Sequence, residues 1–240
     1  MFLAVDADIL LYRSTSSAEV EIEWDPDCWT LLSDLKDAKE AFQHQIETIG
    51  KKLNVDNVVC ALSDHQANYR KSIDPTYKSN RRGSRKPVGY TAMKDWVRHT
   101  YNTIMKPGLE GDDCLGILAT RPGNDCIVVS DDKDLRGIPG QLFVPSKDEL
   151  LEISVDDADR FFLTQVLTGD ASDGYKGCPQ IGPKKAEAIL GPKPNWGAIE
   201  QAYMKAGLTK ADALTQARLA RILRWSDWDA DKGEPILWKP

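Results

Sequence analysis

Short runs of apolar residues alternate along the first part of the chain with longer stretches in which apolar residues recur every three or four positions. Each run is too short for a helix and is typical of a strand buried on both faces of a sheet. The longer stretches have the spacing of amphipathic helices. Strands that alternate with helices predict an α/β fold with a mostly parallel, doubly wound sheet. The runs are residues 2–5, 55–62, 126–129 and 141–144.

Two helices are expected within this α/β part. The first begins at Asp25-Pro26, because Asp is a suitable N-cap and Pro fits the first turn. It runs toward Leu53, with apolar residues at spacings of three, four and seven. The second covers 112–120 and is stopped by the Arg-Pro-Gly sequence at 121–123.

From Ser154 onward the pattern is helical. Ser154 can cap a helix over 155–168, and Gly169 can end it. Further helices are expected over 183–190, 196–206 and 208–225, followed by an irregular tail. The chain is therefore predicted to divide into an α/β core, residues 1–153, and a helical region, residues 154–240.

The bulk composition bounds the class of protein. At 240 residues the chain is long enough to bury a full core. It has no run of about 18 apolar residues, so no membrane span is expected. An acid follows the N-terminus too early for a signal peptide. Five cysteines are widely spaced and contain no CxxC pair, which indicates reduced thiols in a cytoplasm.

The net charge of −6 hides a strong asymmetry. Residues 66–106 hold ten Lys and Arg against two acids, and residues 176–224 hold nine against three. Basic stretches are often only solvated faces, but two of them frame a set of carboxylates here. That distribution favours a metal-dependent enzyme acting on a polyanion.

The carboxylates fall in five short patches, most of which adjoin a predicted strand or helix end. Singly, each patch also fits a helix N-terminus or an Asp-rich turn. Gathered at one sheet edge, each close pair would cost about 1 kcal/mol in water and about 4 kcal/mol at an effective dielectric of 20. Divalent cations relieve this repulsion, and hard oxygen ligands select Mg²⁺ or Mn²⁺. The candidate ligands are Asp6, Asp64, Glu110, Asp112, Asp113, Asp132, Asp134, Asp170 and Asp173.

Two further motifs fit a nucleic-acid partner. The sequence GCPQIGPKKA at 177–186 predicts a hairpin between helices that grips a phosphate backbone, although a plain helical turn is the alternative. Aromatic and basic residues interleave over 69–71 and 77–82, which suits a single-stranded end, although a Tyr at this spacing can equally lie in the core. The candidate nucleic-acid-binding residues are Arg70, Tyr77, Arg82, Gly177, Gly182, Lys184 and Lys185, and Lys78 and Arg81 are favoured as functional residues.

In order and spacing these motifs resemble the 5′-nuclease superfamily, which includes flap endonucleases, bacteriophage 5′-exonucleases and the 5′-nuclease domain of bacterial DNA polymerase I. The resemblance runs from Asp6 to about Leu190. It includes the E-A-D-D patch, with Gly111 in place of Ala, and the S-x-D-K-D-L patch at 130–135. It also includes Y-K-x-N-R at 77–81 and G-D-x-S-D-N at 169–174, where Gly174 replaces Asn.

The resemblance implies a PIN-like α/β core and two bound divalent ions. Asp6, Asp64, Glu110 and Asp112 would hold the first ion. Asp132, Asp134, Asp170 and Asp173 would hold the second, with Asp113 in support. Lys78 and Arg81 would lie near the scissile phosphate.

The resemblance also implies a helix-hairpin-helix at about 169–190. The carbonyls of Cys178 and Ile181 would bind a monovalent cation such as K⁺. Lys176 and Gln180 depart from the usual Pro and Gly in this hairpin. The arch-like basic loop, at about 77–106, is short for a full helical arch.

The expected function is hydrolysis of DNA near a 5′ end or flap, by a 5′-3′ exonuclease or flap endonuclease of replication and repair. The expected protein is monomeric, has no organic cofactor and is phage-encoded, acting in the cytoplasm of a bacterial host. Two alternatives stay open: a PIN-type ribonuclease, and a catalytically inactive DNA-end-binding protein.

Overall fold

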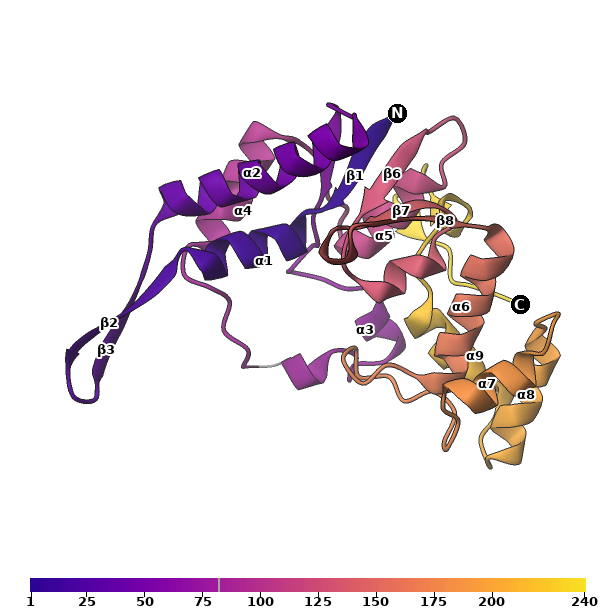
Figure 1. The fold of residues 1–240 in the computed structure, drawn as a ribbon. Helices are drawn as coiled ribbons and strands as arrows, with labels where there is room; N and C mark the ends of the chain where they lie inside the picture. Colours follow the sequence, from indigo (N-terminus) through magenta and orange to yellow (C-terminus); the bar gives the residue numbers. More distant parts are fainter. Residues whose placement is uncertain (82) are drawn as a thin grey trace.

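A six-stranded sheet forms the centre of the α/β part in the computed structural model, which describes residues 1–81 and 83–240 (Figure 1). Its strand order is β5-β4-β1-β6-β7-β8. All neighbouring pairs are parallel except β7 and β8. The mostly parallel α/β fold predicted from the sequence is confirmed. The strands are β1 (Phe2–Asp6), β4 (Val58–Ala61), β5 (Asn102–Ile104), β6 (Cys126–Val129), β7 (Gly140–Val144) and β8 (Glu149–Ile153).

Both faces of the sheet are covered, as the short apolar runs predicted. Leu3 and Val5 of β1 pack in one core cluster with residues of α1 (Ala7–Ser17), α2 (Leu35–Leu53) and α4 (Tyr90–Thr100). Ala4, between them, belongs to a second cluster formed with α5 (Gly111–Ala119) and the segment after 220. This alternation follows from the period of two along a strand.

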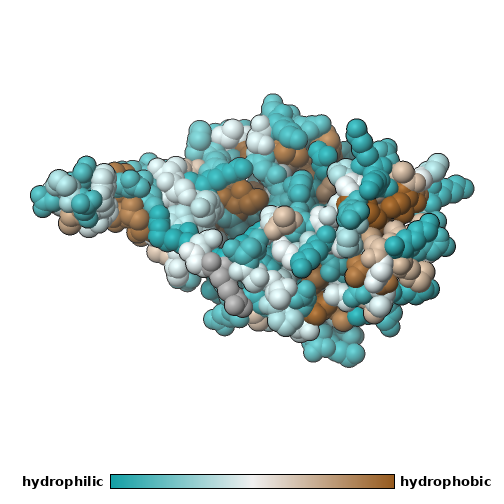
Figure 2. Space-filling view, turned by 90° about the horizontal axis from the view of Figure 1, so that it is seen from below, coloured by the Kyte–Doolittle hydropathy of each residue, from teal (hydrophilic) through white to brown (hydrophobic). Residues whose placement is uncertain are grey.

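The segment between α1 and α2 contradicts the predicted helix start at Asp25-Pro26. It forms an antiparallel hairpin of β2 (Glu19–Asp25) and β3 (Cys28–Ser33), and α2 begins only after Asp34, whose side chain accepts from the Lys36 amide. Alternation of acidic and apolar residues along β2 outweighs the capping signal of Asp25-Pro26. The hairpin projects from the body, with exposed apolar side chains between hydrophilic ones (Figures 1 and 2).

The arch-like loop expected over 77–106 is largely regular structure. After the single turns α3 (Arg70–Ile73) and η1 (Ser79–Arg81), the described loop covers only 83–89. The helix α4 then buries Tyr90, Met93 and Val97 in the core, and β5 forms the sheet edge. Apolar residues at helical spacing form one face of α4, and this face packs against the core.

Residues beyond 154 fold mainly as helices around a third core cluster. The predicted Ser154 cap is present, with its hydroxyl accepting from the Asp157 amide at 3.1 Å. The last helix is shorter than predicted, because Arg221 and Arg224 leave it to contact Asp227. Within the described residues, no helix has the length and apolar character to cross a membrane. The helices are α6 (Val155–Thr168), α7 (Pro183–Leu190), α8 (Trp196–Lys205) and α9 (Lys210–Ala220), followed by η4 (Trp225–Asp227), β9 (Trp228–Asp229) and β10 (Glu234–Pro235).

Gly116 of α5 allows the C-terminal segment to pack directly on this helix. A Cβ at this position would lie 2.2 Å from the Leu223 carbonyl oxygen. We expect Gly116→Ala to lower the free energy of unfolding by about 1–3 kcal/mol, because backbone must move to admit the methyl group. Gly137→Ala is the matched control, since its Cβ would meet nothing nearer than 3.9 Å. Urea unfolding checks both, and equal stability of the two variants would contradict the packing described.

Candidate metal centre

The predicted acidic residues meet at the carboxyl end of the sheet. The chain crosses from one side of β1 to the other between β5 and β6, so the ends of β1, β4 and β6 border a topological switch point. A cavity of about 580 Å³ opens there. Seven of the nine candidate ligands line it: Asp6, Asp64, Glu110, Asp112, Asp132, Asp134 and Asp173.

Part of this carboxylate set is electrostatically strained. Burial raises the pKa of Asp6 to about 7, with further contributions from the charges of Asp8 and Asp132. Burial also raises the pKa of Asp134 to about 7, again with Asp132 contributing. The pKa of Asp112 is raised well above its usual range by burial and by Asp6 and Asp132. These groups therefore take up protons easily when no cation lies between them.

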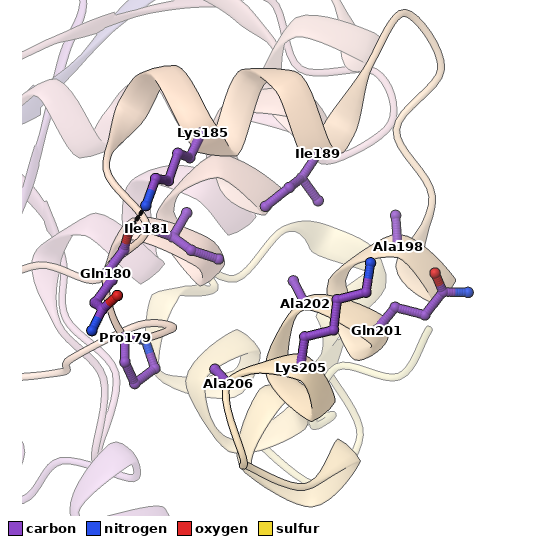
Figure 3. Close-up of a pocket in the computed structure, with 10 residues that line it drawn as sticks. All are labelled: Pro179, Gln180, Ile181, Lys185, Ile189, Ala198, Gln201, Ala202, Lys205 and Ala206. Atoms are coloured by element: carbon purple, nitrogen blue, oxygen red, sulfur yellow. Dashed lines mark hydrogen bonds between the residues drawn. The ribbon is translucent and has the colours of Figure 1, made fainter.

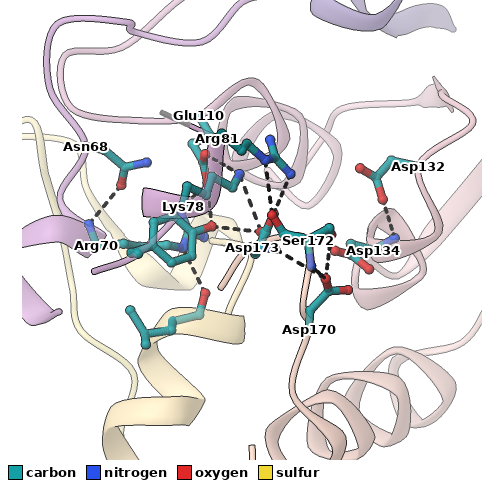
Figure 4. A network of polar contacts seen from close by, with 12 residues as sticks. Asn68, Arg70, Lys78, Arg81, Glu110, Asp132, Asp134, Asp170, Ser172 and Asp173 are labelled. Atoms are coloured by element: carbon teal, nitrogen blue, oxygen red, sulfur yellow. Dashed lines mark hydrogen bonds and ion pairs between the residues drawn. The ribbon is translucent and has the colours of Figure 1, made fainter. Parts of the chain in front are cut away.

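Another part of the set is already neutralised by side chains. Lys78 donates to Glu110 and lies 3.4 Å from Asp173, and Arg81 pairs with Asp173 at 2.7 Å (Figure 4). Burial alone would raise the pKa of Glu110, but the charges of Lys78 and Arg70 lower it overall. Lys78 adopts a left-handed backbone, with φ of 54°. Both predicted catalytic cations thus lie at the cavity.

The cavity fits a hard cation by its donor chemistry, since crowded carboxylate oxygens are the ligands that such ions prefer. Within residues 1–81 and 83–240, however, no three His, Cys, Asp or Glu side chains are arranged to close directly on one ion. The Lys78 ammonium occupies the space between two of the candidate ligands instead. An incoming ion must therefore compete with Lys78 or reach some carboxylates through water.

Asp64 and Asp170 are held by hydrogen bonds. Asp64 lines the cavity while accepting from the amides of Gly108 and Gln66, each at 2.8 Å, and the first of these is the main reason that its pKa is lowered. Asp170 does not line it: its oxygens accept from Lys133 and Ser172. These bonds outweigh burial and lower the pKa of Asp170 to about 2. Asp170 orders the turn that carries Asp173, and its role as a ligand stays a prediction.

The structure contradicts direct metal ligation by Asp113 and DNA contact by Arg70, while the supporting role of Asp113 stays a prediction. Asp113 is fully buried and receives two hydrogen bonds from Arg70, at 2.7 and 2.8 Å, so it faces the interior rather than a metal. The Arg70 side chain is equally buried, and it also donates to the carbonyls of Leu219 and Arg221, which removes it from any DNA surface. This pair joins α3 and α5 to the end of α9.

Tyr77 is likewise not a stacking platform for a base. Its ring is buried, and its hydroxyl donates to Glu110 at 3.0 Å and to Asp173 at 2.9 Å. It therefore positions two carboxylates of the cavity. Arg82, the neighbouring predicted DNA contact, lies outside the described residues.

The predicted hairpin precedes α7. Gly177 is buried, and its amide donates to Gln216 at 2.8 Å, so its predicted phosphate contact is wrong. The absence of a side chain at Gly177 allows its backbone to pack against the backbone of Gly169. Gln180, where the resemblance expects Gly, has a φ of 60°, the left-handed backbone that favours glycine. Gly182, Lys184 and Lys185 are exposed, as phosphate contacts require.

A groove of about 590 Å³ runs between this hairpin and α8 (Figure 3). Ile181 and Ile189 line its apolar part, and Lys185 and Lys205 face it from α7 and α8. Lys185 also donates to the Gln180 carbonyl at 3.0 Å. The groove shares no lining residue with the carboxylate cavity, and it presents cations rather than acids.

Sequence reasoning missed several residues at the cavity. Asp8, two positions after Asp6, lines it and accepts from the Ser63 amide at 2.8 Å. Ser130 donates to Asp6 at 2.7 Å and so orients that carboxylate. His65 and Lys86 also line the cavity. Asp8 and Ser130 lay within the acidic patches already recognised, whereas nothing in the sequence indicated His65.

The raised pKa of Asp134 predicts a pH-dependent penalty in the metal-free protein. The pKa of Asp134 is about 7 in the folded protein and 3.8 ordinarily. Protonated Asp134 therefore adds to the free energy of unfolding below about pH 4, and this stabilisation is lost as the pH rises toward 7. Asp134→Asn should therefore be more stable than the unmodified chain at pH 8, by on the order of 1–3 kcal/mol, and no more stable near pH 4. Urea unfolding in a chelator measures this, with the exposed Asp95→Asn as control. A gain independent of pH would contradict the strain described.

Comparisons with known proteins agree with this geometry. The family model for the 5′-3′ exonuclease N-terminal resolvase-like domain matches residues 2–152. The exonuclease of Escherichia phage T7 is 30% identical over 280 residues, covering 99% of this chain and 93% of the relative.

Solved structures show the same fold. The T5 D15 protein co-crystallised with metal ions aligns with a TM-score of 0.66 at 16% identity, over 91% of this chain and 88% of that one. The bacteriophage T5 D15 flap endonuclease, in a complex with DNA and metal ions, aligns with a TM-score of 0.61 at 13% identity, over the same shares. By its family match and its T7 relative, the chain belongs to the 5′-3′ exonuclease family and is a nuclease of that class.

Proposed function

We propose that the cavity is the catalytic centre of this 5′-nuclease, and that it hydrolyses DNA phosphodiesters near a 5′ end or flap with two Mg²⁺ or Mn²⁺ ions. The observation that carries the proposal is the crowding of eight carboxylates, seven of them candidate ligands, around one cavity at the switch point of the sheet. Three of them, Asp6, Asp112 and Asp134, have pKa values raised by burial and by the charge of neighbouring carboxylates such as Asp132, which is the condition that a bound cation relieves.

We assign Asp6, Asp64, Glu110 and Asp112 to the first ion. Asp132, Asp134 and Asp173 are assigned to the second, with Asp170 fixing the turn of Asp173. When bound, the ions would acidify a water molecule and neutralise charge on the phosphate. Ser130 and Tyr77 would orient the carboxylates that they contact.

Lys78 and Arg81 are proposed to hold the phosphate that is cut. Both line the cavity, and their present partners are carboxylates of the same site. Asn80 and Arg81 also donate to backbone carbonyls of 171–172, which ties this segment to the turn of Asp173. If Lys78 and Arg81 changed partners from these carboxylates to a phosphate of the substrate, their positive charges would lie beside the negative charge that forms during hydrolysis.

The duplex is proposed to lie over the helical region. Gly182, Lys184 and Lys185 would hold its backbone, and Arg82 would contact the strand that enters the cavity. A K⁺ ion at the carbonyls of Cys178 and Ile181 would strengthen the hairpin contact. The basic stretches support this path, whereas the β2–β3 hairpin, which carries acids but no Lys or Arg over 19–33, would repel DNA.

We further propose a monomeric enzyme that needs no organic cofactor and that acts in the cytoplasm of a phage-infected bacterium. The similarity to the T7 exonuclease supports the phage origin. A PIN-type ribonuclease shares the carboxylate cluster but does not need the helix-hairpin-helix. An inactive end-binding protein would bind DNA without metal-dependent turnover.

Replacing one carboxylate tests the assignment of the centre. Asp132→Asn should reduce cleavage of a 5′-flap DNA by at least about 100-fold, because an ion that stabilises the negative charge formed during hydrolysis would be held less well. The affinity for DNA should stay nearly unchanged. Glu47→Gln, an equivalent change on the exposed face of α2, should keep full activity. Product lengths from flap and blunt duplexes, with and without Mg²⁺, give the readout.

Full activity of Asp132→Asn would refute the assignment. Preference for an RNA flap over the matched DNA flap would favour the ribonuclease. DNA binding by the unmodified chain with no Mg²⁺-dependent product would identify an end-binding protein.

Ion binding has a second readout that does not depend on turnover. Mg²⁺ should raise the melting temperature of the unmodified chain, because it binds the folded state and relieves repulsion among carboxylates. The rise should be smaller for Asp112→Asn, which has lost one of the strained acids. Thermal unfolding across a Mg²⁺ titration checks this, and an equal rise in both proteins would show that the ion binds elsewhere.

A further inference from the structure

The cavity has a set of basic and aromatic side chains that the proposed hydrolysis does not use. Two of its cations are already paired, Arg13 with Asp131 and Arg85 with Glu19. Lys71 and Lys86 form no ion pair within the part of the chain that the structure describes. The set comprises Tyr12, Arg13, His65, Lys71, Arg85, Lys86 and Tyr90.

Within this set, Lys86 and His65 touch each other rather than an acid. The Lys86 Nζ lies 2.7 Å from the His65 Nε2 and 4.2 Å from the centre of the Tyr90 ring. The Tyr90 hydroxyl donates to Asp8 at 3.0 Å, and Asp8 also accepts from the Ser63 amide. Asp8 is therefore engaged by other donors, and the Lys86 ammonium lies against the His65 ring nitrogen rather than against an anion.

Such a pair is suited to an oxyanion. The walls of the cavity partly desolvate the Lys86 ammonium, and this outweighs the charge of Asp8 and lowers the pKa of Lys86. An oxyanion accepts hydrogen bonds from an ammonium and from an imidazole N–H, and bonds from a charged donor are stronger than neutral ones. Both residues are exposed and line a cavity that also contains the nuclease carboxylates.

We propose that Lys86 and His65 bind the 5′-terminal phosphate of the strand that is cut. The proposal rests on the proposed nuclease function, since it is that function which brings a DNA 5′ end into this cavity. A terminal phosphate monoester carries up to two negative charges near neutral pH, whereas an internal diester carries one. Lys86, which has no ion-pair partner among the described residues and lies beside an imidazole, therefore favours the more highly charged terminal group, and the enzyme would distinguish phosphorylated from unphosphorylated 5′ ends.

Matched substrates and variants test the site. Two otherwise identical duplexes carry a 5′-phosphate or a 5′-hydroxyl, and each is measured with the unmodified chain, Lys86→Met, His65→Gln and the control Lys51→Met, whose side chain is exposed on α2. The first readout is the ratio of kcat/KM on the two ends with Mg²⁺. The second is the ratio of Kd values from fluorescence anisotropy in a chelator, which remains measurable if no cleavage occurs.

We expect the unmodified chain and Lys51→Met to prefer the 5′-phosphate about tenfold in both ratios, as one charge-assisted contact would give. Lys86→Met and His65→Gln should bring both ratios close to one. A ratio of one for the unmodified chain would overturn the proposal. A uniform loss on both ends in Lys86→Met would show that the pair holds an internal phosphate instead. Absence of cleavage with a preserved anisotropy ratio would reject the nuclease function and keep the phosphate site.

Discussion

Mutual repulsion among carboxylates is the constraint on which the rest of the site depends. The fold delivers acids from the ends of β1, β4 and β6 and from the start of α5 to one cavity, and burial removes the water that would screen them. The structure offsets this repulsion in two ways. The pKa values of three acids, Asp6, Asp112 and Asp134, are raised. Two others form ion pairs, Glu110 with Lys78 and Asp173 with Arg81.

These two responses have different consequences for function. On the proposed assignment, the strained acids would favour a hard cation, because its binding would offset the free energy that their burial costs. The cations that neutralise Glu110 and Asp173 are the groups that a phosphate would need. Binding of ions would therefore release Lys78 and Arg81 from their carboxylate partners at the same place where the substrate arrives. On this proposal, metal binding and substrate binding would be coupled through these two side chains.

Most of the cavity could be predicted from the sequence, because acids after buried parallel strands must share one edge of the sheet. The exceptions have physical reasons. Asp112 and Asp113 are adjacent in a helix and so point about 100° apart, and sequence alone does not tell which faces the core. The burial of Arg70 depends on carbonyls near residue 220, about 150 positions away, which no local pattern reveals. The contact of Lys86 with His65 likewise joins two loops.

The β2–β3 hairpin shows where local signals compete. Asp25-Pro26 has the character of a helix start, but the alternation along β2 favours a strand, and a left-handed residue at Asp27 allows the tight turn between the strands. Gln180 shows the opposite case, since its left-handed backbone matches the glycine that the resemblance led us to expect there. The turn therefore has the left-handed conformation at position 180 although Gln, rather than Gly, occupies it.

Anomalous diffraction from crystals grown with Mn²⁺ tests the central claim most directly. The account predicts two anomalous peaks inside the cavity, within coordination distance of carboxylates that include Asp6, Asp112 and Asp132, with Lys78 moved away from Glu110. A cavity without peaks at saturating Mn²⁺, or peaks confined to other parts of the surface, would contradict it.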